Sequence, residues 1–119
     1  MKIKVCWMYH DIMDLYGDKG NILTLQRRCT DRNIGFELET CAISQKMDLN
    51  AFDLVFLGGG ADKEQLSLIP DLLQRKENIY QALEDHTFFL LICGGYQLFG
   101  QYYISADHEK IEGLKINSY

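Results

Sequence analysis

An unbroken apolar run that stops at a cysteine and two glycines is the feature that most constrains how this chain can fold. Phe88 to Ile92 are all apolar, and Cys93, Gly94 and Gly95 follow at once, before an amphipathic segment begins. A short apolar run bounded by turn residues is typical of a strand buried on both faces, as in a parallel sheet. A cysteine on the turn between a strand and a helix lies where α/β enzymes present a nucleophile, and the helix N-terminus favours its thiolate. Cys93 is therefore the predicted nucleophile.

The rest of the chain alternates strand-like and helix-like segments. Strands are predicted at residues 2–8, 36–43, 53–57 and 88–92, with a fifth beginning in 110–116. Helices are predicted at residues 19–31, at 72–85 and from Gly94 to about Tyr103. Asp18 is predicted to cap the first of these, and Pro70 to lie in a first helical turn. Residues 62–71 are expected to be partly helical. This alternation predicts βαβ units and an α/β fold, a flavodoxin-like, three-layer, doubly wound and mostly parallel sheet with helices on both faces.

Size and charge exclude several classes of protein. The 119 residues suit one domain, residues 1–119, and the net charge of −5 argues against a nucleic-acid surface or an anionic-membrane binder. No apolar run approaches the roughly 20 residues that a transmembrane helix needs, and the N-terminal apolar part is too short for a signal peptide. The sequence therefore predicts a cytoplasmic protein.

The cysteines give no sign of a metal site. Cys6, Cys29 and Cys41 lie in strand-like or helix-like contexts, which predicts buried, reduced thiols that pack as small apolar groups. No two cysteines have the spacing of a zinc site, and no histidine pair completes one. Only Cys93 has a glycine turn beside it.

Three loops leave the carboxyl ends of the predicted strands, where ligands bind in such sheets: residues 9–21, 58–65 and 93–97. A cysteine that attacks a carboxamide creates an oxyanion, which needs two hydrogen-bond donors about 3 Å away. The N–H of Gly94 is one predicted donor, and the glycine loop (Gly58, Gly59 and Gly60) is placed to supply the other. The alternative is structural: Cys93 ends a core strand, and the glycines only permit tight turns and packing.

A nucleophilic cysteine also needs a base, usually histidine. His86 is predicted at the far end of its strand from Cys93, and His108 in a polar loop. His10 is predicted at the correct edge of the sheet, but nothing in the sequence fixes it against Cys93. The nucleophile is therefore predicted without an identified base.

Four motifs make the chain resemble a known family. They are LYGDKGN at residues 15–21, FLGGGADKEQ at 56–65, ICGGYQLFG at 92–100 and IEGL at 111–114. Together they resemble the class I glutamine amidotransferases of the cobyric-acid-synthase-like branch, and within it the glutaminases that serve lipid II amidation. The motifs extend over most of the chain in the order of that family.

The resemblance implies a chemistry and a partner. Glutamine would be hydrolysed through a glutamyl thioester on Cys93, with Gly94, Gly59 and Gly60 at the oxyanion positions and Gln97 helping to bind the substrate. The ammonia would pass to a Mur-ligase-like synthetase subunit that amidates the D-glutamate of lipid II during peptidoglycan synthesis. ATP and magnesium would bind that partner, and this chain would need no cofactor or metal.

The sequence departs from the family pattern after the fourth motif. The family's catalytic histidine and a substrate-binding arginine lie beyond the point at which this chain ends. The resemblance therefore implies an N-terminal portion of the domain that is catalytically incomplete, with an exposed sheet edge and apolar surface prone to self-association. Two alternatives remain open, amidation of a cobyric-acid-type acceptor and a non-catalytic flavodoxin-like binding module.

Overall fold

The computed structural model describes residues 1–13, 18–104, 108 and 110–116, and leaves the side chains of Asp18 and Asp62 undescribed. Its elements, in chain order, are β1 (Lys2–Met8), α1 (Asp18–Asp31), β2 (Gly35–Cys41), the short 3-10 helix η1 (Leu49–Ala51), β3 (Leu54–Leu57), α2 (Asp62–Glu84), β4 (Phe88–Leu91), α3 (Gly94–Phe99), β5 (Tyr102–Ile104) and β6 (Lys110–Glu112). The predicted strands up to β4 and the first predicted helix are confirmed to within a few residues. The predicted capping role of Asp18 falls on an undescribed side chain.

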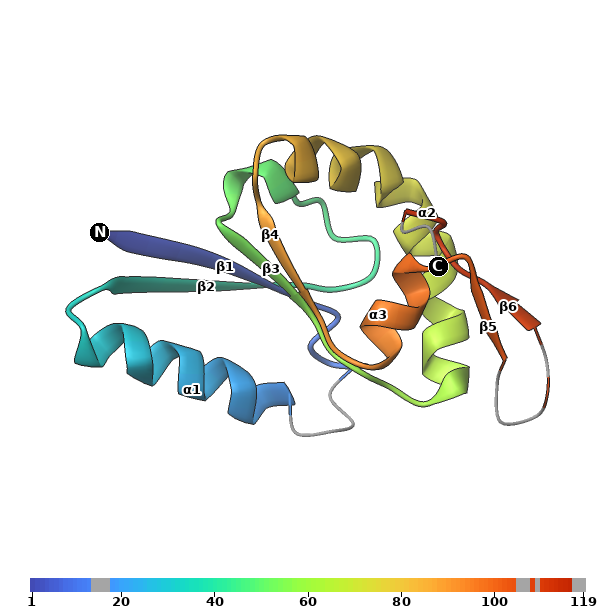
Figure 1. Ribbon diagram of the computed structural model, residues 1–119, viewed down its shortest axis with the longest axis horizontal. Coiled ribbons are helices and arrows are strands. Elements are labelled where there is room, and N and C mark those ends of the chain that lie inside the picture. The colour runs from blue at the N-terminus through green and yellow to red at the C-terminus, as the bar shows by residue number, and fades with distance from the viewer. Residues whose placement is uncertain (14–17, 105–107, 109, 117–119) are drawn as a thin grey trace.

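Four strands form a parallel sheet in the described part of the chain, in the order β2-β1-β3-β4 (Figure 1). The strands alternate with helices, so each parallel neighbour is reached by a crossover over one face of the sheet. Because all four strands run in the same direction, the loops after β1, β3 and β4 leave from one edge of the sheet. The predicted α/β, doubly wound architecture is confirmed.

The sheet separates two apolar clusters, and the alternation of side chains along each strand decides which cluster a residue joins. Cys6 and Met8 of β1 pack with α2 and α3, whereas Val5 and Trp7 of the same strand pack with α1. On β3, Phe56 joins the α1 side. Helices therefore cover both faces, as a three-layer α/β fold requires.

The prediction that residues 88–92 form a strand buried on both faces is wrong for one face. Phe88 is 63% exposed and Leu90 is 36% exposed, while Phe89 and Leu91 pack against the α2 cluster. The register pairs Leu90 with Phe56 on the α1 side of the sheet. Because α1 packs along β2 and β1, its cover does not extend to β4 (Figure 1).

Helix α2 is longer than the sequence pattern predicts, because the partly helical stretch and the following helix form one element. Pro70 lies inside α2 and not in a first turn, which corrects the prediction. Proline removes one backbone N–H from the helical ladder and commonly bends a helix. Figure 1 shows α2 bending part-way along its length.

The end of the described chain differs from the prediction as well. Helix α3 ends at Phe99 and not near Tyr103, because Gly100 adopts an extended conformation. Tyr102–Ile104 then forms β5, which pairs antiparallel with β6. The strand predicted within residues 110–116 therefore exists, but it belongs to this separate two-stranded sheet.

Candidate active site

The cysteine turn (Cys93, Gly94 and Gly95) follows β4 at the carboxyl edge of the sheet. Cys93 has φ 48° and ψ −109°, a conformation that residues other than glycine rarely adopt. Its side chain is exposed and makes no capping hydrogen bond to α3. Backbone strain of this kind is common where an active site presents a reactive group. The turn thus holds the Cys93 thiol outside the helix and open to solvent.

The glycine loop follows β3, the strand beside β4, and is bonded directly to the cysteine turn. The N–H of Gly95 donates to the carbonyl oxygens of Gly58 at 3.1 Å and of Ile92 at 3.0 Å. A Cβ at position 95 would lie 2.5 Å from the carbonyl oxygen of Leu57, so only glycine fits there without displacing the backbone. The two predicted site segments therefore lie in contact.

Gly94, whose N–H is the predicted oxyanion donor, lies between Cys93 and Gly95 in the cysteine turn. Within the described part of the chain, the N–H groups of Gly95 and Gln97 have acceptors, whereas no hydrogen bond uses that of Gly94. Buried backbone N–H groups are nearly always paired. Gly94 is buried, and its N–H, on the residue that follows Cys93, has no acceptor among the described residues.

The first predicted loop also reaches the site through its described residues. The N–H groups of Ile12 and Met13 donate to the carbonyl oxygen of Tyr9, which closes a tight turn after β1. Met13 is fully buried, and its sulfur lies against Gly60, 2.5 Å from where a Cβ would stand. Residues 14–17 lie outside the described residues, so the predicted convergence holds for the beginning of this loop.

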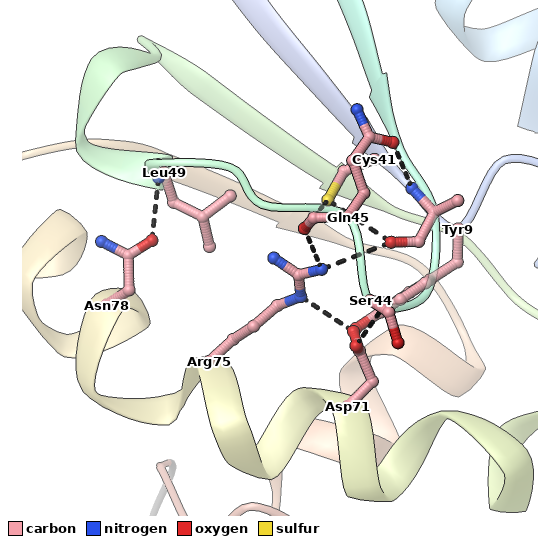
Figure 2. Close-up of polar contacts among 9 residues, drawn as sticks. Tyr9, Cys41, Ser44, Gln45, Leu49, Asp71, Arg75 and Asn78 are labelled. Atoms are coloured by element: carbon pink, nitrogen blue, oxygen red, sulfur yellow. Dashed lines mark hydrogen bonds and ion pairs between the residues drawn. The ribbon is translucent and has the colours of Figure 1, made fainter.

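A buried polar cluster anchors Tyr9 to α2 (Figure 2). The Asp71 carboxylate accepts from the Tyr9 hydroxyl, from the Ser44 N–H at 2.8 Å and from Arg75 Nε at 2.8 Å. Arg75 also donates to the carbonyl oxygen of Gln45 at 2.6 Å. Burial and the bond to Asp71 raise the pKa of Tyr9 well above its usual value. Burial opposes ionisation of Asp71, but its three hydrogen bonds outweigh burial and lower its pKa.

None of the three histidines is joined to Cys93 by a hydrogen bond or ion pair among the described residues. His10 packs edge-on against Trp7, with ring centroids 5.8 Å apart, after a strand that β3 separates from β4. His86 precedes β4, at the opposite end of that strand from Cys93, as predicted. His108 is exposed beside β6.

The other three cysteines are buried, as predicted, but two of them are not simple apolar groups. Cys6 and Cys41 are hydrogen-bonded to each other, and this bond and burial raise the pKa of Cys6 well above its usual range. The same interaction lowers the pKa of Cys41, against the effect of burial, and the Arg75 guanidinium adds to this. Cys93 is thus the exposed thiol, and Cys41 is an ionisable one shielded by the fold.

Gln97, the predicted substrate-binding residue, is exposed on α3, one turn after Cys93. Its backbone N–H donates to the carbonyl oxygen of Cys93 at 3.1 Å. Among the described residues no group of three or more histidine, cysteine, aspartate or glutamate side chains is arranged to hold a metal ion. The described helices include none that is both long and apolar enough to cross a membrane.

Sequence reasoning missed one ion pair and one buried glutamine. Asp71 and Arg75 are one helical turn apart, and this i, i+4 spacing of opposite charges could have indicated their pairing. Gln65 is buried and contacts Gly94, but nothing in its local sequence distinguishes it from a surface glutamine.

Comparison with known proteins adds family information to this geometry. Residues 4–118 match the model of the CobB/CobQ-like glutamine amidotransferase domain. The lipid II isoglutaminyl synthase (glutamine-hydrolyzing) subunit GatD of Streptococcus pneumoniae is 36% identical over 115 residues, 97% of this chain and 44% of that protein. The subunit of the same name from Staphylococcus aureus is 38% identical over 112 residues, 92% of this chain and 46% of that protein.

The chain therefore spans a little under half the length of these two relatives. Among solved structures, a peptidase from an acI-B1 Actinobacterium aligns with a TM-score of 0.49 and 14% identity. That alignment covers 95% of this chain and 51% of the peptidase.

Proposed function

This chain belongs to the CobB/CobQ-like glutamine amidotransferase domain family, and we propose that it carries the nucleophile and oxyanion-binding part of a glutaminase. Cys93 is the nucleophile, Gly94 and the glycine loop supply oxyanion donors, and Gln97 contacts the substrate. The proposal joins family membership to the local geometry around one exposed thiol.

The observation that carries the proposal is the unused N–H of Gly94 beside the exposed Cys93. Cys93 has a positive φ and an exposed thiol that makes no capping hydrogen bond to α3, and the bond from Gly95 to Gly58 holds the glycine loop alongside. A nucleophile and a fixed backbone donor on adjacent residues are what acyl transfer requires. The exposed face of β4 also weighs against a purely structural role for Cys93 at the end of a core strand.

The chemistry follows from these positions. The Cys93 thiolate attacks the side-chain carboxamide carbon of glutamine, a C–S bond forms, and the carbonyl oxygen becomes an oxyanion. The N–H of Gly94, with Gly59 or Gly60, stabilises that charge. Collapse of the intermediate breaks the C–N bond, the nitrogen takes up a proton and leaves as ammonia, and water then hydrolyses the glutamyl thioester to glutamate and the free thiol.

The relatives support a particular destination for the ammonia. Both are named as the glutamine-hydrolysing subunit of lipid II isoglutaminyl synthase, which favours lipid II amidation over a cobyric-acid-type acceptor. We therefore propose a Mur-ligase-like synthetase subunit as partner, binding ATP and magnesium and amidating the D-glutamate of lipid II in the cytoplasm.

The leaving nitrogen needs a proton donor, and no described histidine is joined to Cys93 by a hydrogen bond or ion pair. The proposed function therefore includes negligible turnover of glutamine by these 119 residues alone. What the chain should retain is a Cys93 that reacts selectively with glutamine-like electrophiles, because that step needs only the nucleophile, oxyanion donors and substrate contacts.

The test uses an L-glutamine analogue in which a chloromethyl ketone replaces the side-chain carboxamide. The thiolate adds to the ketone, which forms an oxyanion, and then displaces chloride to leave a stable thioether. We expect Cys93 to be labelled about tenfold faster by the L analogue than by its D enantiomer, and L-glutamine to slow the labelling. Mass spectrometry of peptides identifies the modified cysteine, and Cys93→Ser is the control.

Simple exposure of the thiol predicts a different result. Equal rates with the L and D analogues, or no protection by L-glutamine, would show an accessible cysteine without a glutamine site. Iodoacetamide provides the baseline rate for each thiol, because its reaction creates no oxyanion.

A further inference from the structure

Gln65 is one of few polar side chains buried in the described structure, being only 2% exposed. It is the fourth residue of α2, the helix that follows the glycine loop. Its Nε2 donates to the hydroxyl oxygen of Tyr103 at 2.8 Å, and Tyr103 is itself 8% exposed, on β5. Burying a primary amide is costly unless it is hydrogen-bonded, so a buried glutamine calls for an explanation.

The carboxamide of Gln65 lies directly against Gly94. A Cβ built on Gly94 would be 1.9 Å from Oε1 of Gln65 and 2.5 Å from its carboxamide carbon. The amide thus fills the space that any side chain at position 94 would need. Gly94 is held from one side by this amide, while its neighbour Gly95 is held from another by the carbonyl oxygen of Gly58.

The hydrogen bond to Tyr103 fixes the amide in turn. The segment after β6 is tied to the end of α3, because the N–H of Leu114 donates to the carbonyl oxygen of Leu98 at 2.7 Å. β5 pairs with β6 and is held through it. Gln65 therefore connects the beginning of α2, the cysteine turn and β5. A shift of its side chain would be transmitted to Gly94, because close-packed interiors are not freely deformable.

We propose that Gln65 is a positioning residue, whose carboxamide, held by Tyr103, sets the orientation of the Gly94 N–H beside Cys93. The inference rests on the proposed function, in which that N–H is an oxyanion donor. Its role is indirect, because Gln65 acts through Gly94 and does not touch the substrate.

The chemistry of the site explains why residue 65 is a glutamine. A neutral amide offers a donor to Tyr103 and a compact planar group to Gly94 at the same time. Glutamate at this position would bury a carboxylate next to a forming oxyanion, where a second negative charge opposes the reaction. Methionine would fill a similar volume but lose the hydrogen bond that fixes the group.

The experiment compares Gln65→Met, Gln65→Glu and Tyr103→Phe with the unaltered chain, and follows labelling of Cys93 by two reagents. The L-glutamine chloromethyl ketone passes through an oxyanion, and iodoacetamide does not. We expect the ratio of the two rates to fall on the order of tenfold in Gln65→Met and Gln65→Glu, less than the loss on removing an oxyanion donor itself. Tyr103→Phe should lower the ratio in the same direction but less, because the amide remains.

The iodoacetamide rate and the urea unfolding midpoint report whether each variant is folded. A variant in which both labelling rates change together has altered exposure of Cys93, and that result would overturn the positioning role. An unchanged ratio in Gln65→Met and Tyr103→Phe would overturn it as well, while the L-over-D preference of the unaltered chain leaves the proposed function intact. If the unaltered chain shows no such preference, both proposals fail together.

Discussion

The N–H of Gly95 donates a 3.1 Å hydrogen bond to the carbonyl oxygen of Gly58. This single bond joins the turn after β4 to the loop after β3, and it places the two predicted halves of an oxyanion site side by side. It also continues the pairing of two parallel strands, because the N–H of Ile92 bonds to the carbonyl oxygen of Leu57 just before it. The site is thus built on the sheet ladder itself.

Gly95→Ala should destabilise the chain, because the added Cβ would stand 2.5 Å from the carbonyl oxygen of Leu57, a backbone atom that cannot move alone. We expect a loss of about 1–3 kcal/mol in the free energy of unfolding, measured by urea titration. Gly20→Ala on α1 is the control, since a Cβ there meets nothing within 4 Å. That change should stabilise the chain by about 0.4–1 kcal/mol, and equal effects of the two substitutions would contradict this explanation.

Iodoacetamide should label Cys93 first in the folded chain at neutral pH. Cys93 is the exposed thiol, whereas Cys6, Cys29 and Cys41 are buried. Cys41 is the stringent comparison, because its pKa is lowered by the neighbouring Cys6 thiol and by Arg75, so burial is what protects it from the reagent. Peptide mass spectrometry with and without urea measures the order, and fast labelling of Cys41 without urea would show that the β2 region opens.

Asp71→Asn should lower the free energy of unfolding at neutral pH. It should also make that free energy depend less on pH in the acid range. The folded-state pKa of Asp71 is lowered, so its contribution is present above the unfolded value of about 3.9 and is lost as the pH falls through the folded value. Because Arg75 would lose its buried carboxylate partner, we expect a loss of about 3 kcal/mol at pH 7.

Urea midpoints measured between pH 7 and pH 2 test this dependence on Asp71. Glu39→Gln removes an exposed carboxylate from β2 and serves as the control for the loss of one negative charge. A profile for Asp71→Asn parallel to the unaltered one would show that the carboxylate does not carry the acid dependence.

The exposed face of β4 should promote self-association. Phe88 and Leu90 lie on one face of a strand that has a partner on its β3 side only, within the described sheet. Leu90→Lys should raise the concentration at which light scattering appears, because a charge on an edge strand opposes pairing with another chain. Leu23→Lys, on the exposed side of α1, should have little effect; equal effects would indicate general charge repulsion.

The parts of the fold predictable from the sequence are those encoded by local pattern. The strand of residues 2–8 alternates as a strand should, and the glycines at 58–60 and 94–95 end strands where the structure ends them. The predicted burial of Phe88 and Leu90 is wrong. An apolar run shows that a strand suits the core, but it does not show which neighbouring elements cover the strand. The position of Pro70 was mispredicted, because in sequence a proline inside a bent helix cannot be told from a proline in the first turn of a helix.

The supporting side chains of the site could not be predicted, because their contacts span long distances in the sequence. Gln65 and Tyr103 are 38 residues apart, and Tyr9 and Asp71 are 62 apart. The placement of Cys93, Gly94 and the glycine loop at one edge followed from the parallel direction of the predicted strands, and their catalytic roles stay predictions. Gln97 lies on the expected helix, but its contact with substrate is likewise a prediction.

Gly94→Ala and Gln65→Ala should be coupled in stability. Alone, the alanine at position 94 would stand 1.9 Å from Oε1 of Gln65, and the amide could retreat only by giving up its bond to Tyr103. Alone, Gln65→Ala leaves a void beneath Gly94. In the double variant the new methyl group enters that void, so we expect its loss in the free energy of unfolding to be smaller than the sum of the two single losses by at least about 1 kcal/mol.

Gly95→Ala with Gln65→Ala is the matched control and should be additive, because the clash at position 95 is with the backbone of β3. Additivity in both pairs, measured by urea unfolding, would mean that the carboxamide of Gln65 does not hold Gly94 in place.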